Sequence, residues 1–284
     1  MKEQVQVSVV QFDAAWLERD ANVARMKEFV AREAGEHGAD LVVFPELATT
    51  GYLKPYLEDL DFTSRLYAQS EPVPGPTTDA LGAVAREHGA HVIVGVSRTH
   101  PKIPHVLYNS AALIGPDGEV IGVYDKLHAA IEEKQFYIAG NTTDVHETEL
   151  GRIGMNICYD VRFPELARAQ ALQEADLIVA VWAMYEQPGK APSDSIIIRC
   201  RMRARENVVY FVGCNRSGRE GDRVYFGRSI VAGPDGCVIA KSDTDAEEVL
   251  RGTLTDEALQ EERERQSYLQ DRRPELYEAL VRPL

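Results

Sequence analysis

The chain has 284 residues, a length that fits a single large α/β domain spanning residues 1–284. Hydrophobic residues make up 44% of it and charged residues 27%, which is ordinary for a globular protein and excludes a disordered chain. The net charge of −14 argues against nucleic acid and anionic membranes as partners, since both carry negative charge, and favours a small-molecule ligand.

In the first half of the chain, short apolar runs alternate with amphipathic stretches, as in a layered α/β protein. The expected order is strand, helix, strand, helix, strand, at Val5–Phe12, Asn22–His37, Leu41–Phe44, Thr77–Gly89 and His91–Ser97. A hairpin is expected next, with strands Val106–Ile114 and Val120–Tyr124 around the turn sequence Gly115-Pro-Asp-Gly118.

The second half repeats this order of elements. Strands and helices alternate at Ile153–Ile157, Phe163–Glu174, Leu177–Trp182, Ser193–Asn207 and Val208–Cys214. Two local echoes support an internal two-fold relation: Gly38–Phe44 resembles Glu174–Ala180, and Ile114–Val120 resembles Ala232–Val238. Two related halves predict a four-layer αββα sandwich, with two mixed sheets face to face, helices outside and active-site residues at the strand ends.

After Thr255 the chain becomes a charged helical stretch, Glu257–Gln270, followed by Asp271–Tyr277. A helix this polar is either a solvated arm or one that packs on another chain. We favour the second alternative and expect residues 256–284 to form a C-terminal arm on a partner subunit. The expected assembly is a homodimer or a larger homo-oligomer.

The residues before Gln11 lack the apolar core of a signal peptide, and no later run reaches the roughly 18 apolar residues of a membrane span, so a cytoplasmic protein is expected. The four cysteines, Cys158, Cys200, Cys214 and Cys237, are spaced by 42, 14 and 23 residues. This spacing fits neither a zinc site nor a disulfide framework, and the seven histidines are scattered. We therefore predict reduced thiols and no metal.

Cys158 ends an apolar strand and precedes the turn into a helix that begins near Pro164. A thiol at such a turn points away from the sheet, and the helix N-terminus there favours both a thiolate and a developing oxyanion. Considered alone, such a cysteine is more often a buried structural thiol than a nucleophile, since free cysteines are among the most buried residues.

Two further polar residues follow apolar strands. Glu46 comes after Leu41–Phe44, where partial burial would raise its pKa and make it a usable base. Lys126 follows Val120–Tyr124, where a fixed ammonium could stabilise an oxyanion. Either residue alone is more often a solvated surface side chain. The combination of a carboxylate, an ammonium and a thiol, each at a strand end, indicates an active site.

This combination resembles the nitrilase superfamily of carbon–nitrogen hydrolases over nearly the whole chain. The resemblance rests on Phe44-Pro-Glu46, Tyr124-Asp-Lys-Leu-His128 and Ile157-Cys-Tyr-Asp160 with Arg162-Phe-Pro-Glu165. It extends to Arg203–Asn207, Cys214–Arg216, Tyr225–Ser229 and Asp271–Tyr277. The family implies the αββα sandwich expected above, assembled as dimers or larger oligomers through helices and C-terminal arms.

The resemblance also implies a second glutamate after the lysine. Glu133-Lys-Gln-Phe-Tyr-Ile-Ala-Gly140 is similar to the family segment Glu-Lys-x-x-Phe-x-x-Gly, so Glu133 is the fourth candidate, and its neighbour Glu132 is the alternative assignment. In the implied mechanism Glu46 takes the proton of Cys158, the thiolate attacks a carbonyl carbon, and Lys126 with the Tyr159 N–H holds the oxyanion. Water then hydrolyses the thioester, which requires no cofactor.

The residues after the nucleophile favour an amide substrate. True nitrilases typically have Cys-Trp-Glu, whereas this chain has Cys158-Tyr-Asp160, as amidase and carbamoylase branches do. Family hydrolases of N-carbamoyl-D-amino acids carry two consecutive arginines here, but this chain has Val161-Arg162, and we favour a structural ion pair for Arg162. The prediction is an amidase that releases ammonia; an N-carbamoyl amine or amino acid amidohydrolase is the alternative, and a nitrilase is less favoured.

Specificity is expected in the loops Leu47–Asp61 and Ala183–Pro192. The candidate substrate-binding residues are Tyr52, Tyr159, Trp182 and Ala183, with Tyr56, Tyr185 and Glu186 as further pocket residues. Two other classes remain open: a non-catalytic interaction protein that keeps the fold, and a redox-sensing thiol protein. Intact Glu46, Lys126, Glu133 and Cys158 argue against the first, and the lack of a cysteine near Cys158 in sequence argues against the second.

Overall fold

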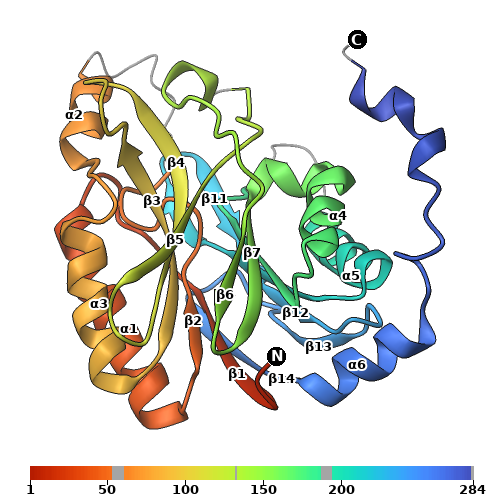
Figure 1. Cartoon of the computed structure of the whole chain (residues 1–284). Helices are drawn as coiled ribbons and strands as arrows, with labels where there is room; N and C mark the ends of the chain where they lie inside the picture. The colour runs from red at the N-terminus through yellow and green to blue at the C-terminus, as the bar shows by residue number, and fades with distance from the viewer. Residues whose placement is uncertain (53–60, 132, 187–193, 283–284) are drawn as a thin grey trace.

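Two six-stranded sheets pack face to face in the computed structural model of the chain, which describes residues 1–52, 61–131, 133–186 and 194–282. Helices cover the outer face of each sheet, so the layers run helix, sheet, sheet, helix (Figure 1). The predicted αββα sandwich is therefore confirmed.

The first sheet has the strand order β14-β1-β2-β3-β4-β5. Its three central strands, β1, β2 and β3, are parallel, and the remaining pairs are antiparallel. The strands are β1 (Gln4–Gln11), β2 (Leu41–Val43), β3 (His91–Thr99), β4 (Leu107–Ile114), β5 (Val120–Asp125) and β14 (Glu248–Thr255).

The second sheet has the order β13-β12-β9-β8-β7-β6, with β7, β8 and β9 parallel and the other pairs antiparallel. Its strands are β6 (Val145–Thr148), β7 (Gly151–Ile157), β8 (Leu177–Trp182), β9 (Tyr210–Asn215), β12 (Ile230–Ala232) and β13 (Val238–Lys241). A separate two-stranded ribbon consists of β10 (Ser217–Glu220) and β11 (Arg223–Phe226).

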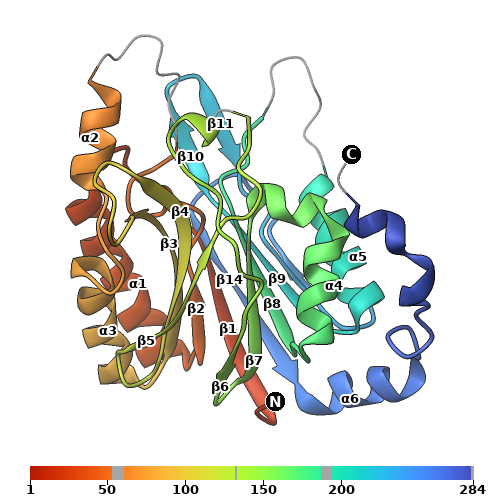
Figure 2. The same ribbon diagram turned by 45° about the horizontal axis from the view of Figure 1, so that its top comes forward.

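The helices form the two outer layers, as both views show (Figures 1 and 2). On the first sheet lie α1 (Arg19–His37) and α3 (Pro76–His88), and on the second lie α4 (Pro164–Leu172) and α5 (Ser195–Asn207). Two further helices are α2 (Phe62–Gln69) and α6 (Asp256–Arg265), and short 3-10 turns occur at η2 (Glu133–Gln135), η3 (Cys158–Arg162), η4 (Pro274–Leu276) and η5 (Glu278–Val281).

The alternation of side chains along the strands creates separate apolar layers. In β1, Val5, Val7 and Val9 face the second sheet, where they join Ile153, Met155 and Val179 in the central core. Val10 faces the opposite way and packs under α1 and α3 with Met26 and Leu81. Because both faces of each central strand are buried, these strands read as continuous apolar runs rather than as alternating ones.

The predicted internal two-fold relation is visible in the topology. Gly38 and Glu174 both adopt left-handed backbone, with φ of 67° and 64°, just before β2 and β8. Two residues later, Asp40 accepts the Gln6 N–H at 2.8 Å and Asp176 accepts the Arg152 N–H at 2.9 Å. The hairpins β4–β5 and β12–β13 share the Gly-Pro-Asp-Gly turn, and each has one irregularity in its register.

Several elements were not predicted from the sequence, namely α2, β6, β10, β11, β12, β13 and β14. β14 and the exposed strand β13 have mixed polar and apolar residues, and β14 is defined by eight residues of pairing with β1 rather than by its own pattern. The strand predicted from Val208 begins at Tyr210 instead, because Val208 closes α5 in a left-handed conformation with φ of 52°.

The predicted C-terminal arm has two parts. Its first part is α6, which packs on its own chain through fully buried Leu259 and through Arg263, whose guanidinium contacts Asp176 at 2.9 Å. The second part, residues 266–282, lies outside the layer of α4 and α5 (Figures 1 and 2). Within the described part of the chain, no helix has the length and apolar character needed to cross a bilayer.

Candidate active site

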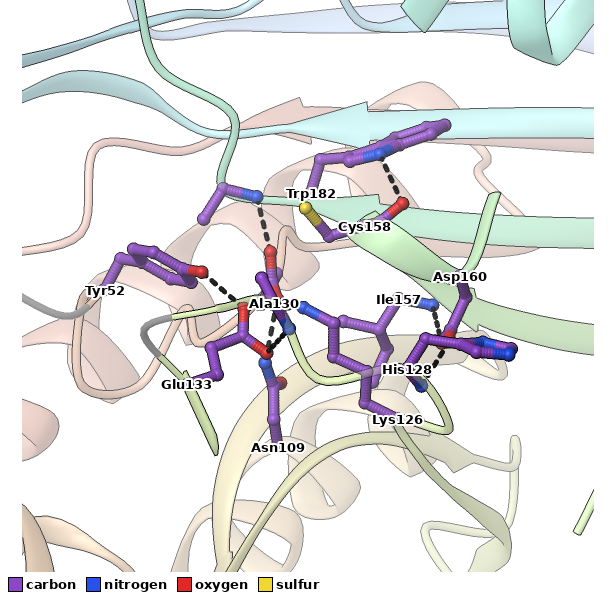
Figure 3. A network of polar contacts seen from close by, with 12 residues as sticks. Tyr52, Asn109, Lys126, His128, Ala130, Glu133, Ile157, Cys158, Asp160 and Trp182 are labelled. Carbon is purple, nitrogen blue, oxygen red and sulfur yellow. Dashed lines mark hydrogen bonds and ion pairs between the residues drawn. The ribbon is translucent and has the colours of Figure 1, made fainter. Parts of the chain in front are cut away.

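The four candidate catalytic side chains converge at one edge of the two sheets. Glu46 follows β2, Lys126 follows β5 and Cys158 follows β7, so each lies at the carboxyl end of its strand. Parallel strands in both sheets bring these ends to the same side of the molecule. Figure 3 shows Lys126, Glu133 and Cys158 pointing toward one another across the gap between the sheets.

Lys126 lies between two buried carboxylates. Its Nζ donates to Glu46 Oε1 and to Glu133 Oε1, each at 2.7 Å, and all three side chains are at most 2% exposed. The remaining Glu133 contacts are the Tyr52 hydroxyl, which donates to Oε1, and the Ala130 N–H, which donates to Oε2 at 3.4 Å. The alternative residue Glu132 lies outside the described residues.

The Glu46 carboxylate is oriented by three further features of the fold. Asn109 Nδ2 donates to its Oε1 at 2.7 Å and the Ala183 N–H donates to its Oε2 at 2.8 Å. Its backbone packs tightly against β3, where Gly95 is required because a Cβ there would lie 2.3 Å from the Pro45 oxygen and 2.6 Å from the Leu47 nitrogen. The glutamate is thus held at both its backbone and its carboxylate.

The charge states follow from burial and neighbouring charges. Burial raises the pKa of Glu46; the Lys126 ammonium opposes this increase and the Glu133 charge adds to it. For Lys126, burial favours the neutral amine, but the charges of Glu46 and Glu133 outweigh it, so the pKa stays well above its usual value. Lys126 is therefore a permanent cation in the site, and Glu46 is a carboxylate of increased basicity.

Cys158 begins the short turn η3 rather than lying at the first turn of α4, and its backbone is left-handed, with φ of 48°. Burial raises the pKa of its thiol well above the usual value, and the charge of Glu46 adds to this effect. Burial, and after it the negative charge of Glu46, favours the thiol over the thiolate. Both effects oppose the thiolate that the sequence-based argument from a helix N-terminus favours.

The four candidate substrate-binding residues contact different parts of the site. Tyr52 reaches Glu133 through its hydroxyl, and Ala183 contacts Glu46 through its backbone N–H. Trp182 is almost fully buried, and its Nε1 donates to the Cys158 carbonyl oxygen at 3.1 Å, which holds the turn. Tyr159 is partly exposed and packs edge-on against Phe163, with ring centres 5.5 Å apart.

The other pocket candidates are placed as follows. Tyr185 packs on Tyr225, with ring centres 5.9 Å apart, and Glu186 is exposed, while Tyr56 lies outside the described residues. Arg162 is exposed, and its guanidinium lies over the Tyr159 ring at 5.4 Å from the ring centre rather than in an ion pair with a described residue. Among the residues that the structure describes, none forms the ion pair with Arg162 that the sequence favoured.

Sequence reasoning missed two residues beside the site. Asn109 lies within β4, where nothing in the local pattern distinguishes it from other strand residues, yet it contacts Glu46. Asp160 was used only to separate amides from nitriles, but its buried carboxylate contacts Tyr124 and His128 on the segment that carries Lys126. Both contacts join residues distant in sequence, so pairing across the fold is needed to find them.

Among the described residues, no three or more His, Cys, Asp or Glu side chains are grouped so that they could hold a metal ion. The groups that the described part of the site brings together are the thiol, the two carboxylates and the ammonium. Such a set can transfer a proton, attack an electrophilic carbon and stabilise an oxyanion.

Comparisons with known proteins agree with this geometry. The carbon-nitrogen hydrolase family profile matches residues 6–264. A nitrilase of Pyrococcus abyssi is 35% identical over an alignment that covers 86% of this chain and 87% of the nitrilase. An N-carbamoylputrescine amidase of Arabidopsis thaliana is 32% identical over 99% of this chain and 96% of the amidase. A mutant amidase of Nesterenkonia sp. AN1, solved with the acetamide moiety of fluoroacetamide added covalently at its active-site cysteine, is 26% identical, with a TM-score of 0.80 and coverage of 99% and 98%.

The fold and the buried thiol site define a hydrolase built on the αββα sandwich, and the chain belongs to the carbon-nitrogen hydrolase family of the nitrilase superfamily. It is an enzyme that acts on carbon–nitrogen bonds other than peptide bonds, with amidases among its relatives and structural neighbours.

Proposed function

We propose that the protein hydrolyses a small amide, releasing ammonia through a thioester on Cys158. The observation that carries this proposal is the buried group beside the thiol, in which Lys126 Nζ lies 2.7 Å from Glu46 and 2.7 Å from Glu133. A protonated lysine at this position is a fixed donor for a developing oxyanion, and the glutamate of increased basicity is a fixed proton acceptor.

In the first half of the reaction, Glu46 accepts the thiol proton while the sulfur forms a bond to the carbonyl carbon of the amide. Lys126 and the Tyr159 N–H bind the oxyanion of the tetrahedral intermediate. Collapse of this intermediate breaks the carbon–nitrogen bond, and Glu46 returns the proton to the leaving nitrogen as ammonia departs. The raised pKa of the thiol means that proton transfer accompanies the attack.

In the second half, Glu46 takes a proton from water, whose oxygen attacks the thioester carbon. The same donors hold the second oxyanion, and its collapse breaks the carbon–sulfur bond. The thiolate regains its proton and the carboxylic acid leaves. Throughout, Glu133 keeps Lys126 oriented, and Tyr52, Tyr159, Trp182 and Ala183 bind the substrate or shape its pocket.

An amide is favoured over a nitrile by two observations. The nucleophile segment is Cys158-Tyr-Asp160, as in amidase and carbamoylase branches. The amidase of Nesterenkonia sp. AN1, which shares the fold over 99% of this chain, was solved with an acetamide moiety on its active-site cysteine. The second candidate function is hydrolysis of an N-carbamoyl amine, favoured by the similarity to an N-carbamoylputrescine amidase over 99% of this chain.

The test is an ammonia-release screen of aliphatic amides, dicarboxylic ω-monoamides, N-carbamoyl compounds and nitriles, with Cys158→Ala as the blank. We expect an amide to give the fastest release, and intact-mass spectrometry of a rapidly quenched reaction to find an acyl adduct on Cys158. Release at the same rate from the blank would remove the hydrolase proposal. Full activity in Glu46→Gln would remove the assignment of the base.

We further propose that the chain forms one catalytic domain over residues 1–284 and a homodimer or larger homo-oligomer in the cytoplasm. The single domain is supported by the pairing of β14, near the end of the described chain, with β1, near its start. The cytoplasmic location is supported by the four cysteines, which are free thiols. Support for assembly comes from exposed apolar side chains on the arm and on α5. They are Leu276, Leu280 and Val281 on the arm, and Ile198 and Met202 on α5.

A further inference from the structure

We propose that Asp160 is a positioning residue that fixes the nucleophile turn relative to the Lys126 segment. Its carboxylate is fully buried and lies two residues after Cys158. Figure 3 shows it between the Ile157 N–H and the His128 side chain. The inference rests on the proposed function, since it assigns to Asp160 the alignment of the thiol with the group that would hold the oxyanion.

The first set of contacts holds the turn that carries the thiol. Asp160 Oδ2 accepts the N–H of Ile157 at 3.1 Å, and the Asp160 carbonyl oxygen accepts the N–H of Phe163 at 3.0 Å. Between these contacts lies Cys158 with left-handed backbone, a conformation that costs about 1–2 kcal/mol for a residue with a Cβ. A strained backbone of this kind persists only where neighbouring contacts hold it.

The second set of contacts reaches the segment that carries the lysine. The Tyr124 hydroxyl donates to Asp160 Oδ2 at 2.7 Å, the His128 N–H donates to Oδ1 at 2.9 Å, and His128 Nδ1 lies 2.8 Å from Oδ1. Tyr124 and His128 are the residues two positions before and two positions after Lys126. The Asp160 carboxylate therefore forms hydrogen bonds with the chain on both sides of Lys126.

Additional packing makes this junction rigid. The His128 ring stacks on Phe163, with ring centres 3.7 Å apart and planes at 14°, so the residue that closes the nucleophile turn also contacts the lysine segment. The Tyr124 hydroxyl is buried at 2% residue exposure, and its hydrogen bond crosses from the first sheet to the second. Burial makes each of these hydrogen bonds costly to leave unpaired.

Asp160 acts on the reaction through other residues. The hydrogen bonds of its carboxylate go to Ile157, Tyr124 and His128, and within the described part of the chain none goes to Glu46, Lys126 or Glu133. Its effect is therefore geometric: it sets the distance between the sulfur and the ammonium. A displacement of about 1 Å between reacting groups can lower a rate by about 100-fold.

The experiment compares Asp160→Asn, Tyr124→Phe and the double variant with the wild type. Asp160→Asn replaces one carboxylate oxygen, a hydrogen-bond acceptor, by an amide NH2 group, which is a donor. The NH2 group would then face the N–H or O–H donors that the oxygen accepts from in the wild type. Tyr124→Phe removes one hydroxyl and leaves the other contacts of the carboxylate. Asp176→Asn is the matched control, because Asp176 also accepts a backbone N–H of the neighbouring strand, at 2.9 Å, but precedes β8 at the opposite end of the sheet.

Two measurements are made on each variant. The first is kcat and KM for the best amide of the screen. The second is the rate at which acrylamide alkylates Cys158, read by peptide mass spectrometry, with exposed Cys237 in the same sample as the internal reference. Melting temperature is recorded in parallel, so that a general loss of stability is seen separately.

For Asp160→Asn we expect kcat to fall about 100-fold with KM within about threefold, slower alkylation of Cys158 and unchanged alkylation of Cys237. Tyr124→Phe should lower kcat by about 10-fold, and the double variant should be no worse than Asp160→Asn, because both changes disrupt the same junction. Asp176→Asn should lower the melting temperature but keep kcat.

Three results would overturn the proposal. They are a folded Asp160→Asn variant with kcat and Cys158 alkylation within about threefold of wild type, multiplicative effects of Asp160→Asn and Tyr124→Phe, or an equal loss of kcat in Asp176→Asn. If Asp160→Asn does not fold, Tyr124→Phe alone decides: wild-type kcat and alkylation would reject the role of the junction. Failure of the proposed function is distinct, since no amide would then be turned over by the wild type while the alkylation comparison would still apply.

Discussion

The environment of Cys158 and Glu46 acts on the two groups in the same direction, because burial disfavours the charged form of each. Lys126 opposes this effect on both groups, and its Nζ contacts Glu46 at 2.7 Å. Because burial raises the pKa of the thiol, we expect proton transfer to Glu46 to accompany attack by the sulfur. In the proposed reaction, Lys126 stabilises the Glu46 carboxylate and donates to the oxyanion. Its contacts with Glu46 and Glu133 fix its position for both tasks.

Asn109 offers a test of the base through pH. Its hydrogen bond to Glu46 lowers the pKa of that carboxyl group, so Asn109→Ala should raise it further. Activity needs the ionised carboxylate and is lost as pH falls through this pKa, so the acid limb of the kcat/KM profile should move to higher pH. Asn207→Ala, which removes a buried asparagine at the end of α5, is the control. An unmoved acid limb in Asn109→Ala would contradict the assignment.

A second test distinguishes Glu133 from its neighbour Glu132 as the glutamate that holds Lys126. Glu133→Gln removes one of the two charges that hold Lys126, and kcat should fall by about 100-fold, as for loss of a group that orients an oxyanion donor. Its charge also raises the pKa of Lys126, so any basic limb should move to lower pH. The neighbouring Glu132→Gln is the matched control and should keep near wild-type kcat. The reverse pattern would assign the second glutamate to position 132.

At the scale of elements, strands of the two sheets deliver the site residues and the turns after them set their geometry. The left-handed turns before β2 and β8 are equivalent in the two halves, but one has Gly38 and the other Glu174. Only glycine adopts this conformation without a steric cost, so the second half carries strain that the first half avoids. The internal symmetry therefore identifies a position where the chain can be stabilised.

Glu174→Gly should increase the free energy of unfolding by up to about 1 kcal/mol, the relief of left-handed strain less the extra entropy of glycine in the unfolded chain. The ion pair with Arg152 that is lost is exposed and contributes little. Denaturant unfolding provides the measurement, and Glu174→Ala, which loses the ion pair but keeps the strain, should show no gain. Equal stability changes in the two variants would reject the strain argument.

In the whole molecule, the residues after α6 lie outside the layer of α4 and α5 (Figure 1), contact it through Leu269, and expose apolar side chains. Leu276 and Leu280 are 66% and 65% exposed, which is unusual for leucines on an ordered segment. The first part of the arm is anchored to its own chain through Leu259. Because α6 packs on its own chain, we expect the contact with a second copy to be made by the residues after α6.

The double variant Leu276→Glu, Leu280→Glu should convert the proposed oligomer to monomers, because two charges would be buried at the interface. Sedimentation velocity measures the change. Ile103→Glu, which alters an exposed apolar residue far from the arm in sequence, should leave the assembly intact. A wild-type chain that sediments as a monomer, or a double variant that sediments as the wild type does, would contradict the role of the arm.

The layered α/β class, the central strands and the places of Cys158, Glu46 and Lys126 at strand ends could be predicted from local sequence patterns, because apolar runs and turn residues are local signals. Resemblance to a family added Glu133, and the structure brings its carboxylate to 2.7 Å from Lys126. Of the edge strands, β5 was predicted, but β6, β13 and β14 were missed; β14, for example, is defined by its pairing with β1 and not by its own pattern.

The electrostatics of the site and the contacts that hold its residues in place could be read from the folded chain alone. The pKa of Cys158 is raised by burial and then by the charge of Glu46, 112 residues earlier in the sequence, and both causes exist only after the two sheets have assembled. The contacts of Asn109 with Glu46 and of Asp160 with Tyr124 and His128 likewise join separate elements. Local sequence patterns do not predict such contacts, because burial and the distance between side chains are properties of the packed chain.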